Sequence, residues 1–396
     1  MNYHIISQDK FFQSYIEDIY KIGEEANNIF FVRGEEGDSV FFSTERPVEY
    51  MGYEKDHIIE RLKTIQPSDK LFVAWYDMSM ADLIIESGIE CKVYSFLMGG
   101  EFYNDPPEYH DFWLYDSKTK YYIRRKKRNH GALAFPFRTM YKLPYYLYDS
   151  YKHSKYIREQ YKHKLATLKR LDFIVAPKED TAEIDFIKKL YPTCHAEHAI
   201  GTFNQNLDLA GNVIYKFEEK QNKPLKILLG NSGDPTNNHM DAIKYMNSSR
   251  LFDSEIYCPL SYGDKIYIEY IEKWMQKQLG ERFFPLNSFM ARDEYVKFLS
   301  TIDIFVMNHN RQQAVGNIIT ALVLGKPVFM KKESVTYRMF KRMNVQHVYD
   351  IKKLAESNID EIRIQTYKDR EKTIKILSQF FSENTRLKCL KKNLCK

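Results

Sequence analysis

Two polar segments of the chain each follow an apolar run that has the length and composition of a buried strand. The first, GNSGDPTNNH, covers residues 230–239, and the second, NHNRQQAVGN, covers residues 308–317. Glycines let a backbone approach a ligand closely, and the free N–H groups at the start of a helix attract negative charge. Both segments therefore have the residue types of a phosphate-binding loop, although neither has the spacing of a P-loop or of the GxGxxG motif.

In the first segment, glycines and small polar side chains can cradle a phosphate or cap the helix that follows. An ordinary capped turn is the alternative interpretation of this segment when it is considered alone. Gly230 and Gly233 allow close backbone approach to an anion, and the polar side chains that offer donors, acceptors and an N-cap are Ser232, Asp234, Thr236 and Asn237.

In the second segment, six consecutive polar residues directly follow a buried strand. Holding so many polar groups next to a buried strand costs free energy, so the pattern favours a functional role over a purely structural one. Gly316 and Asn317 open the following helix, so its positive end would face the loop, and a pyrophosphate is the natural ligand. Arg311 can add a bidentate contact. His309 can add a hydrogen bond, and Gln312 and Gln313 can reach sugar or ribose hydroxyls.

Three carboxylates follow apolar runs in the first half of the chain: Asp9, Asp77 and Glu101. Any of them could deprotonate an acceptor hydroxyl, and each could equally be a helix N-cap or a turn residue. The chain has no DxD pair that would hold a divalent ion on a pyrophosphate. We therefore expect that a group attached to the pyrophosphate is transferred to the acceptor hydroxyl without a metal or other cofactor. Arg311 and the helix terminus would neutralise the pyrophosphate as it leaves.

Apolar strand-like runs alternate with helix-like segments in two series, which predicts an α/β protein with two Rossmann-like domains facing each other across a cleft. In such sheets the ligand lies beyond the carboxyl ends of the strands, where the polar loops follow. We expect an acceptor-binding domain over 1–210, a donor-binding domain over 225–370, and a terminal helix and tail over 371–396 that pack back on the first domain. The runs that we expect to be strands are 3–6, 28–32, 39–43, 70–76, 91–97, 173–177, 226–230, 254–260, 282–284, 302–308 and 327–330. The polar segment 218–224 is the best candidate for the linker.

The chain has 396 residues and a net charge of +6, and the charge is unevenly distributed. Residues 124–170 hold fourteen Lys or Arg and two acids, a net of +12, so the remainder carries −6. Many aromatic residues lie in the same segment, a combination that suits anionic lipid headgroups or nucleic acid. Ile157, Tyr161, Leu165 and Leu168 have helical spacing, which predicts a basic amphipathic helix; packing of its apolar face on its own domain is the alternative.

The N-terminus has no signal-peptide pattern, and no apolar stretch is long enough to span a membrane. The five cysteines form no CxxC pair, so we expect reduced thiols and no metal site. A cytoplasmic protein is predicted.

The segment IDIFVMNHNRQQAVGNIITALVLGKPVFM (302–330) resembles the donor site of GT-B glycosyltransferases. KILLGNSGDPTNNHMDAI (226–243), the RQQ of residues 311–313 and Gly316 resemble glycosyltransferase family 56, the TDP-N-acetylfucosamine:lipid II N-acetylfucosaminyltransferases. The resemblance implies a TDP-linked deoxyamino sugar as donor and a polyprenyl-diphosphate-linked saccharide as acceptor at the inner membrane face. It assigns donor binding to Gly230, Asn231, Ser232, Asp234, Asn237, Asn308, Arg311, Gln312, Gly316 and Asn317.

Two alternatives remain from the sequence. One is a nucleic-acid-binding protein that uses residues 124–170, although no RNP-like, KH-like or helix-turn-helix pattern is visible. The other is a different nucleotide-sugar enzyme on the same architecture, such as an epimerase. We expect a glycosyltransferase that associates with the anionic membrane surface through residues 124–170 and does not bind nucleic acid.

Overall fold

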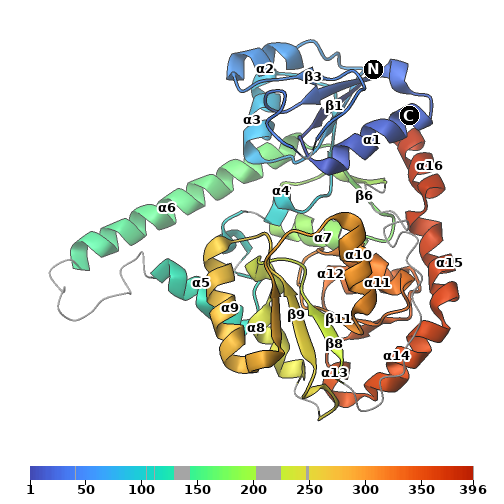
Figure 1. Ribbon diagram of the computed structural model, residues 1–396. Helices are drawn as coiled ribbons and strands as arrows, with labels where there is room; N and C mark the ends of the chain where they lie inside the picture. Colours follow the sequence, from blue (N-terminus) through green and yellow to red (C-terminus); the bar gives the residue numbers. More distant parts are fainter. Residues whose placement is uncertain are drawn as a thin grey trace. The chain divides into compact units, whose positions relative to one another are not determined.

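The computed structural model describes residues 1–40, 42–103, 105–110, 112–128, 143–201, 224–246 and 249–395. The chain forms two compact units, and each unit contains more than one stretch of the sequence (Figure 1). The first unit comprises residues 1–109, 156–205 and 380–396, and the second comprises residues 110–155 and 206–379. The second unit thus includes residues 110–155, whereas the sequence analysis places them in the N-terminal domain.

Within its described residues, the first unit has a parallel sheet of seven strands in the order β3-β2-β1-β4-β5-β6-β7. The order reverses at β1, which pairs with β2 on one side and β4 on the other. The strands are β1 (Asn2–Ile6), β2 (Asn28–Val32), β3 (Glu49–Tyr50), β4 (Lys70–Val73), β5 (Lys92–Phe96), β6 (Phe173–Ala176) and β7 (Glu197–Ile200). The helices are α1 (Lys10–Lys21), α2 (Lys55–Leu62), α3 (Met78–Ser87), α4 (Gly100–Tyr103), α7 (Thr181–Leu190) and α16 (Glu383–Leu394).

The C-terminal helix α16 is part of the core of the first unit. Its Leu390 and Leu394 are buried in the same cluster as the apolar face of α1. Arg386 of α16 also forms a buried bidentate pair with Asp18 of α1, at 2.6 and 2.9 Å. Removing one partner of a buried ion pair costs about 3–5 kcal/mol, so this contact fixes the last helix firmly to the first.

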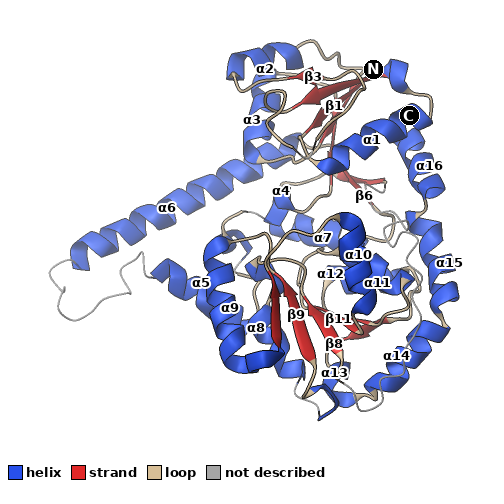
Figure 2. Ribbon diagram, in the orientation of Figure 1, coloured by secondary structure: helices blue, strands red, loops and turns tan. Residues whose placement is uncertain are grey.

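The second unit also has a parallel sheet, with six strands among its described residues in the order β10-β9-β8-β11-β12-β13 (Figure 2). The order reverses at β8, which pairs with β9 and β11. The strands are β8 (Lys226–Leu229), β9 (Glu255–Pro259), β10 (Phe283–Leu286), β11 (Ile304–Met307), β12 (Val328–Met330) and β13 (Val348–Asp350). The helices are α5 (Ser117–Arg128), α8 (His239–Ala242), α9 (Lys265–Leu279), α10 (Arg292–Thr301), α11 (Val315–Val323), α12 (Val335–Arg342), α13 (Lys353–Glu356) and α14 (Ile359–Lys368).

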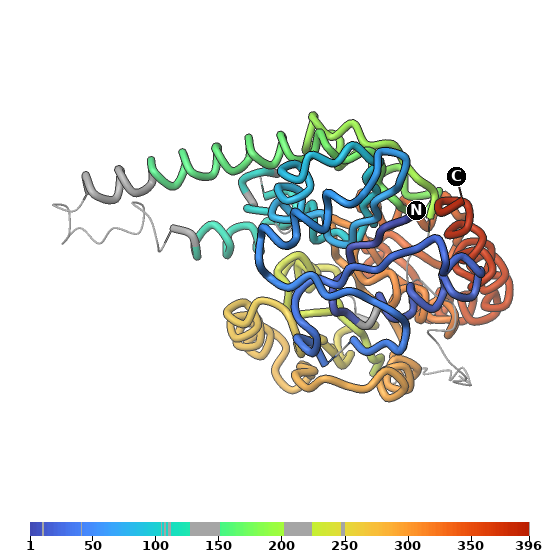
Figure 3. Tube along the Cα trace, turned by 90° about the horizontal axis from the view of Figure 1, so that it is seen from above, coloured from blue at the N-terminus to red at the C-terminus, as the bar shows by residue number. Residues whose placement is uncertain are grey.

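Two further helices contain residues of both units: α6 (Leu143–Thr167) and α15 (Arg370–Phe381). In Figure 3, the coloured part of α6 is drawn as one continuous helix. In the second unit, both faces of the sheet are buried at the central strand β8, since successive residues of a strand point to opposite faces and Ile227, Leu228 and Leu229 are all fully buried. Ile227 and Leu229 of β8 join the cluster formed with α8 and α9, whereas Leu228 is buried outside that cluster.

One strand predicted from the sequence is wrong. Residues 39–43 were expected to form a strand, but Ser39, Val40, Phe42 and Ser43 lie in a loop, and Val40 is 92% exposed. The strand next to β2 is instead β3, whose polar residues give no strand signal. Most of the expected linker, residues 218–223, lies outside the described residues.

The turn after β8 requires a glycine at position 230. Gly230 has φ +73°, and a Cβ atom there would lie 2.7 Å from Asn237 Oδ1 and 2.8 Å from His239 Nε2. Gly88, at the end of α3, has nearly the same φ of +70° but no atom within 4 Å of an added Cβ. A side chain added at Gly88 would therefore cause backbone strain alone, whereas one added at Gly230 would cause backbone strain and overpacking together.

We expect Gly88→Ala to lower the free energy of unfolding by about 1–2 kcal/mol, the cost of a left-handed conformation for a residue with a Cβ. Gly230→Ala should cost about 1–3 kcal/mol more, because it also overpacks the turn. Urea unfolding followed by circular dichroism measures both values. Equal losses in the two variants would contradict the close packing around Gly230.

Candidate functional site

The loop after β8 is organised by the side chain of Asn237, which is fully buried. Its Nδ2 donates to the carbonyl oxygens of Ser232 and Asp234, each at 3.0 Å, and its Oδ1 accepts from the N–H of Asn231 at 3.0 Å. Asp234 caps the short turn that follows, accepting from the N–H of Thr236 at 2.8 Å. The side chain of Asn237 therefore holds the shape of the loop. Asp234 caps the turn, as expected from the alternative interpretation of this segment as an ordinary capped turn.

Side-chain contacts connect this loop to the loop after β11. His309 Nε2 lies 3.1 Å from Asn237 Oδ1, and because that oxygen only accepts hydrogen bonds, the His309 proton is on Nε2. Gln313 donates through Nε2 to Asn231 Oδ1 at 2.9 Å, and its Oε1 lies 2.8 Å from the Thr236 hydroxyl. The two loops, about 75 residues apart in the sequence, thus form one polar surface at the carboxyl ends of β8 and β11.

Helix α11 begins at this surface without a side-chain cap. Its N-cap residue is Ala314, which has φ 59° and cannot accept a hydrogen bond with its side chain, and no acid lies in the first turn. The first-turn N–H groups of Gly316 and Asn317 and the positive end of the helix dipole thus remain suited to an anionic ligand. The half-buried guanidinium of Arg311, which donates to the carbonyl of Gln312 at 3.2 Å, adds a full positive charge to the same loop.

Two buried histidines lie within the loops. Burial lowers the pKa of His239 to about 3, and burial together with the positive charges of Arg311 and Lys331 lowers the pKa of His309 to about 3. Both imidazoles are therefore neutral near pH 7. Within the described part of the chain, His239 Nε2, His309 Nδ1 and Asn308 Oδ1 are buried polar atoms without a hydrogen-bond partner.

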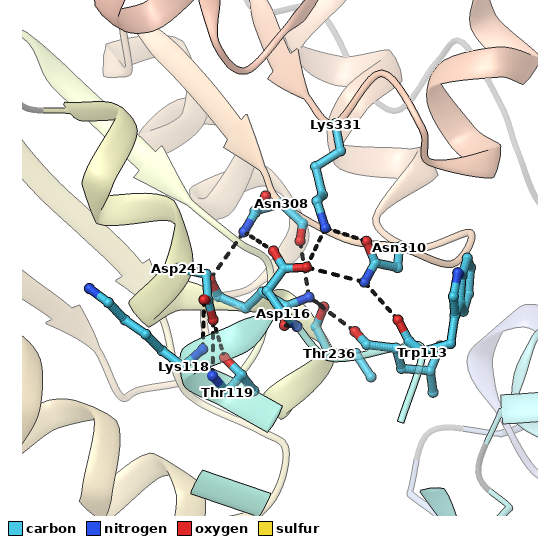
Figure 4. A network of polar contacts seen from close by, with 11 residues as sticks. Trp113, Asp116, Lys118, Thr119, Thr236, Asp241, Asn308, Asn310 and Lys331 are labelled. Atoms are coloured by element: carbon cyan, nitrogen blue, oxygen red, sulfur yellow. Dashed lines mark hydrogen bonds and ion pairs between the residues drawn. The ribbon is translucent and has the colours of Figure 1, made fainter. Parts of the chain in front are cut away.

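The structure adds residues that the sequence analysis did not select. Tyr262, in the loop after β9, receives a hydrogen bond from Asn231 Nδ2 at 3.2 Å, and its side chain is 59% exposed. Its sequence context, a polar SYGD loop after a buried strand, could have indicated it. Asp116 and Lys331 also contact this region, as Figure 4 shows, but no local pattern connects Asp116 with loops more than 100 residues away.

Six of the predicted donor-binding residues are joined by the contacts above or through Asn237 Nδ2, which also donates to Ser232 Oγ at 3.1 Å. These six residues are Asn231, Ser232, Asp234, Asn237, His309 and Gln313. Two others have their side chains directed elsewhere in the unit. Gln312 is buried, with Nε2 at 4.0 Å from Met339 Sδ, and Asn317 Nδ2 donates to the Tyr295 hydroxyl at 3.0 Å.

The three candidate carboxylates lie in the first unit, and Asp77 is held by two structural contacts. It is the N-cap of α3, accepting from the N–H of Met80 at 2.9 Å, and it pairs with Arg33 at 2.8 Å. Burial alone would raise the pKa of Asp77, but the charge and hydrogen bond of Arg33 outweigh it, so the pKa lies below its ordinary value. A carboxylate stabilised in this way is a weak base.

Glu101, on the short helix after β5, is almost completely buried. Its Oε1 accepts from the N–H of Met98 at 2.8 Å, and among the described residues its Oε2 has no hydrogen-bond partner. Burial raises the pKa of Glu101 to about 7, against smaller lowering effects of neighbouring N–H groups and Lys164. The group can change its charge near neutral pH but has little access to a ligand.

Asp9 follows β1 at the point where the strand order of the first unit reverses, and its side chain is half-buried. The preceding residue, Gln8, fixes this loop: its Nε2 donates to the carbonyls of Arg33 and Glu35, at 3.3 and 2.6 Å, and its Oε1 accepts from the N–H of Ser39. Ligands of parallel α/β sheets bind at such a reversal. Topology therefore favours Asp9 over Glu101.

No group of three or more His, Cys, Asp or Glu side chains in the described ranges is arranged to hold a metal ion. In the second unit, the groups suited to an anion are the start of α11, backbone N–H groups and the guanidinium of Arg311.

The chain is similar in fold to glycosyltransferases of known structure. Sucrose-phosphate synthase from Thermosynechococcus elongatus gives a TM-score of 0.60 at 10% identity, with 99% of this chain and 98% of that chain covered. A glycosyltransferase from Rickettsia africae gives 0.59 at 12% identity, covering 100% and 98%. HepE from Anabaena, in complex with UDP and glucose, gives 0.59 at 10% identity, covering 100% and 99%.

A family model described as 4-alpha-L-fucosyltransferase glycosyl transferase group 56 matches residues 145–393, which is more than half of the chain. That range contains both loops of the second unit, and the two parallel-sheet units have the architecture of the GT-B type. The protein therefore belongs to glycosyltransferase family 56 and is a glycosyltransferase of the GT-B type.

Proposed function

We propose that the second unit binds a TDP-linked deoxyamino sugar, such as N-acetylfucosamine, and that the enzyme transfers this sugar to a polyprenyl-diphosphate-linked saccharide. The observation that carries the proposal is the junction of two polar loops beside an uncapped helix N-terminus and Arg311. The fold shared with HepE, which was solved with UDP and glucose, supports a nucleotide ligand. The TDP group and the lipid-linked acceptor are supported by the resemblance of the donor loops to family 56.

The chemistry of the proposed step follows from where charge develops. The acceptor oxygen attacks the anomeric carbon, the bond from that carbon to the diphosphate breaks, and the diphosphate leaves with additional negative charge. N–H groups in the first turn of α11 and the guanidinium of Arg311 stabilise that charge without a metal ion. We assign the removal of the acceptor hydroxyl proton to Asp9, which its neighbour Gln8 holds in a fixed loop.

Nucleotide binding tests the donor site directly. At a concentration one hundred times its Kd, a bound ligand stabilises its protein by about 2.7 kcal/mol, and each kcal/mol raises Tm by about 2–4 °C for a unit of this size. We expect TDP and TDP-sugars to raise Tm by about 5–10 °C, and UDP and GDP compounds to have smaller effects at the same concentration. Absence of a shift with every nucleotide would contradict the donor site.

Nucleotide binding, measured by the rise in Tm, also tests the role of Arg311. Arg311→Ala should weaken TDP binding about 10- to 100-fold, because it removes a charge-assisted contact with the diphosphate, and should leave the circular dichroism spectrum unchanged. Arg282→Ala is the matched control, since Arg282 lies before β10, at the opposite edge of the same sheet. Full transfer activity in Arg311→Ala would refute the assignment.

The general base is tested by isosteric substitution of two of the carboxylates, Asp9 and Glu101. Asp9→Asn should lower kcat by about 10²- to 10⁴-fold without changing the Kd for TDP, because it removes only the proton acceptor. Glu101→Gln keeps an acceptor for the N–H of Met98 and should retain kcat within a few-fold. If Glu101 were the base, kcat/KM would fall tenfold per unit below about pH 7, where its carboxyl becomes protonated, and Glu101→Gln would abolish activity.

The helix α6 supports a membrane-binding role, but through its charge and not through the predicted apolar face. Tyr161 donates to the carbonyl of Leu190 at 2.6 Å, and its ring packs on Tyr109, so this part of the apolar face is used within the first unit. The exposed residues include Tyr151, Lys152, Lys155, Tyr156, Arg158 and Lys162. Part of the predicted basic segment, 129–142, lies outside the described residues, and within the described ranges no helix has both the length and the apolar composition needed to cross a membrane.

We infer that these exposed basic and tyrosine side chains bind an anionic membrane surface. Each basic residue near such a surface contributes about 1 kcal/mol, so replacing Lys152, Lys155, Arg158 and Lys162 by Gln should weaken binding to phosphatidylglycerol vesicles more than about 100-fold. Replacement of the exposed Lys265, Lys273, Lys277 and Lys353 by Gln changes the net charge equally and should have little effect. Binding to RNA or DNA oligonucleotides without binding to vesicles would favour the nucleic-acid alternative and exclude the membrane role.

A further inference from the structure

A short segment that leads into α5 and includes its first turn, residues 113–119, packs against both donor loops of the second unit (Figure 4). On the side of the first loop, the carboxylate of Asp241 accepts from the N–H groups of Lys118 and Thr119, at 2.8 and 3.0 Å, and from the Thr119 hydroxyl at 2.8 Å. Asp241 on α8 thereby caps the first turn of α5. The segment is fixed to the end of the first loop by charge-assisted hydrogen bonds.

Two asparagines, Asn238 and Asn308, also join the two loops to each other. Asn238 Nδ2 donates to the carbonyl of Asn308, and Asn308 Nδ2 donates to the carbonyl of Asn238, both at 3.2 Å. Both side chains are fully buried, and Asn238 has φ 51°. This reciprocal pair connects the first loop directly with the second.

Asp116 contacts both asparagines. Its N–H donates to Asn238 Oδ1 at 2.7 Å, and its Oδ2 accepts from Asn308 Nδ2 at 3.1 Å. Its Oδ1 accepts from Asn310 Nδ2 at 3.4 Å and pairs with the ammonium of Lys331, which follows β12. Asp116 thus touches residues from three strand-end loops, one through its backbone N–H and two through its carboxylate.

The charge of this carboxylate is balanced locally. The side chains of Asp116 and Lys331 are each 17% exposed, and Lys331 Nζ also contacts Asn310 Oδ1 at 2.5 Å. Loss of one partner of a mostly buried pair leaves the other charge and its amide neighbours unsatisfied. Asn310 is directly followed by Arg311, so a shift of Asn308 and Asn310 would move the guanidinium that the donor site requires.

We propose that Asp116 is a positioning residue of the donor site, which holds the two loops in the register that presents Arg311 and the start of α11 to a diphosphate. The inference rests on the proposed donor site but adds a third part of the chain to it. The carboxylate of Asp116 acts through Asn308, Asn310 and Lys331, its backbone N–H bonds to Asn238, and the residue makes no contact of its own with the sugar in this role.

The test compares Asp116→Ala with a matched ion-pair variant. Asp360 pairs with Arg250 at 2.6 Å, and its neighbour Arg363 pairs with Asp303 just before β11, which places this cluster at the opposite edge of the same sheet. Asp116→Ala should raise the donor KM and the Kd for TDP about 10- to 100-fold, with the KM for the acceptor unchanged. Asp360→Asn should lower Tm without changing the donor KM.

A double-mutant cycle separates positioning from a merely structural role. Asp116→Asn and Lys331→Met each leave one charge uncompensated, so their combined effect on donor KM should be smaller than the product of the single effects, by about tenfold or more. Hydrogen exchange provides a readout that needs no nucleotide: amides of 230–239 and 308–317 should exchange faster in Asp116→Ala than in the unmodified chain. If Asp116→Ala folds, binds TDP normally and keeps slow exchange in both loops, the inference is wrong while the donor site stands.

Absence of TDP binding in the unmodified chain would instead overturn the donor site and the positioning role together. If Asp116→Ala does not fold, Asp116→Asn provides the same comparison, since an amide keeps an acceptor for Asn308 but cannot balance Lys331. An unchanged donor KM in Asp116→Asn, together with additive effects in the cycle, would also overturn the proposal.

Discussion

The pairing of β8 with β11 is the constraint on which the proposed donor site depends. These strands are separated by about 75 residues, and their parallel register, Ile227 with Ile304 and Leu229 with Val306, brings their carboxyl ends to the same edge of the sheet. Contacts between His309 and Asn237 and between Gln313 and Asn231 follow from that alignment. A shift of one residue would reverse the side chains of a strand between the two faces and destroy both the core and the loop junction.

The site obtains its positive character from groups that are always positively polarised. The buried histidines are kept neutral, so they act as fixed hydrogen-bonding groups, and His309 uses its Nε2 proton on Asn237. The positive end of α11 and the guanidinium of Arg311 keep their polarity over the physiological pH range. Donor binding should therefore change little between pH 6 and 8, and a pH dependence of transfer in that range would arise from the acceptor side.

The sequence predicts this part of the fold well because the information is local. The apolar runs of β8, β9, β11 and β12 agree with their expected positions within one or two residues. The membership in family 56 is confirmed by the match over residues 145–393. Strands with little apolar character, such as β7 and β13, and the separate helix α16 were not predicted, because tertiary packing and not local pattern stabilises them.

The position of the candidate site could be predicted from local sequence, but the contacts of its side chains could not. The polar loops could be found because each directly follows a buried strand, but the role of each side chain could not, since Asn237 is used inside its loop and Asn317 is bonded to Tyr295. Asp116 could not be found at all from its surroundings in the sequence. It belongs to a segment that leaves the first unit after residue 109 and returns to it at residue 156, and such a segment shows its partners only in three dimensions. Asn238 and Asn308 bond directly to each other across the two loops, and Asp116 contacts both asparagines from a third chain segment, so the junction is held from outside the loops as well as between them.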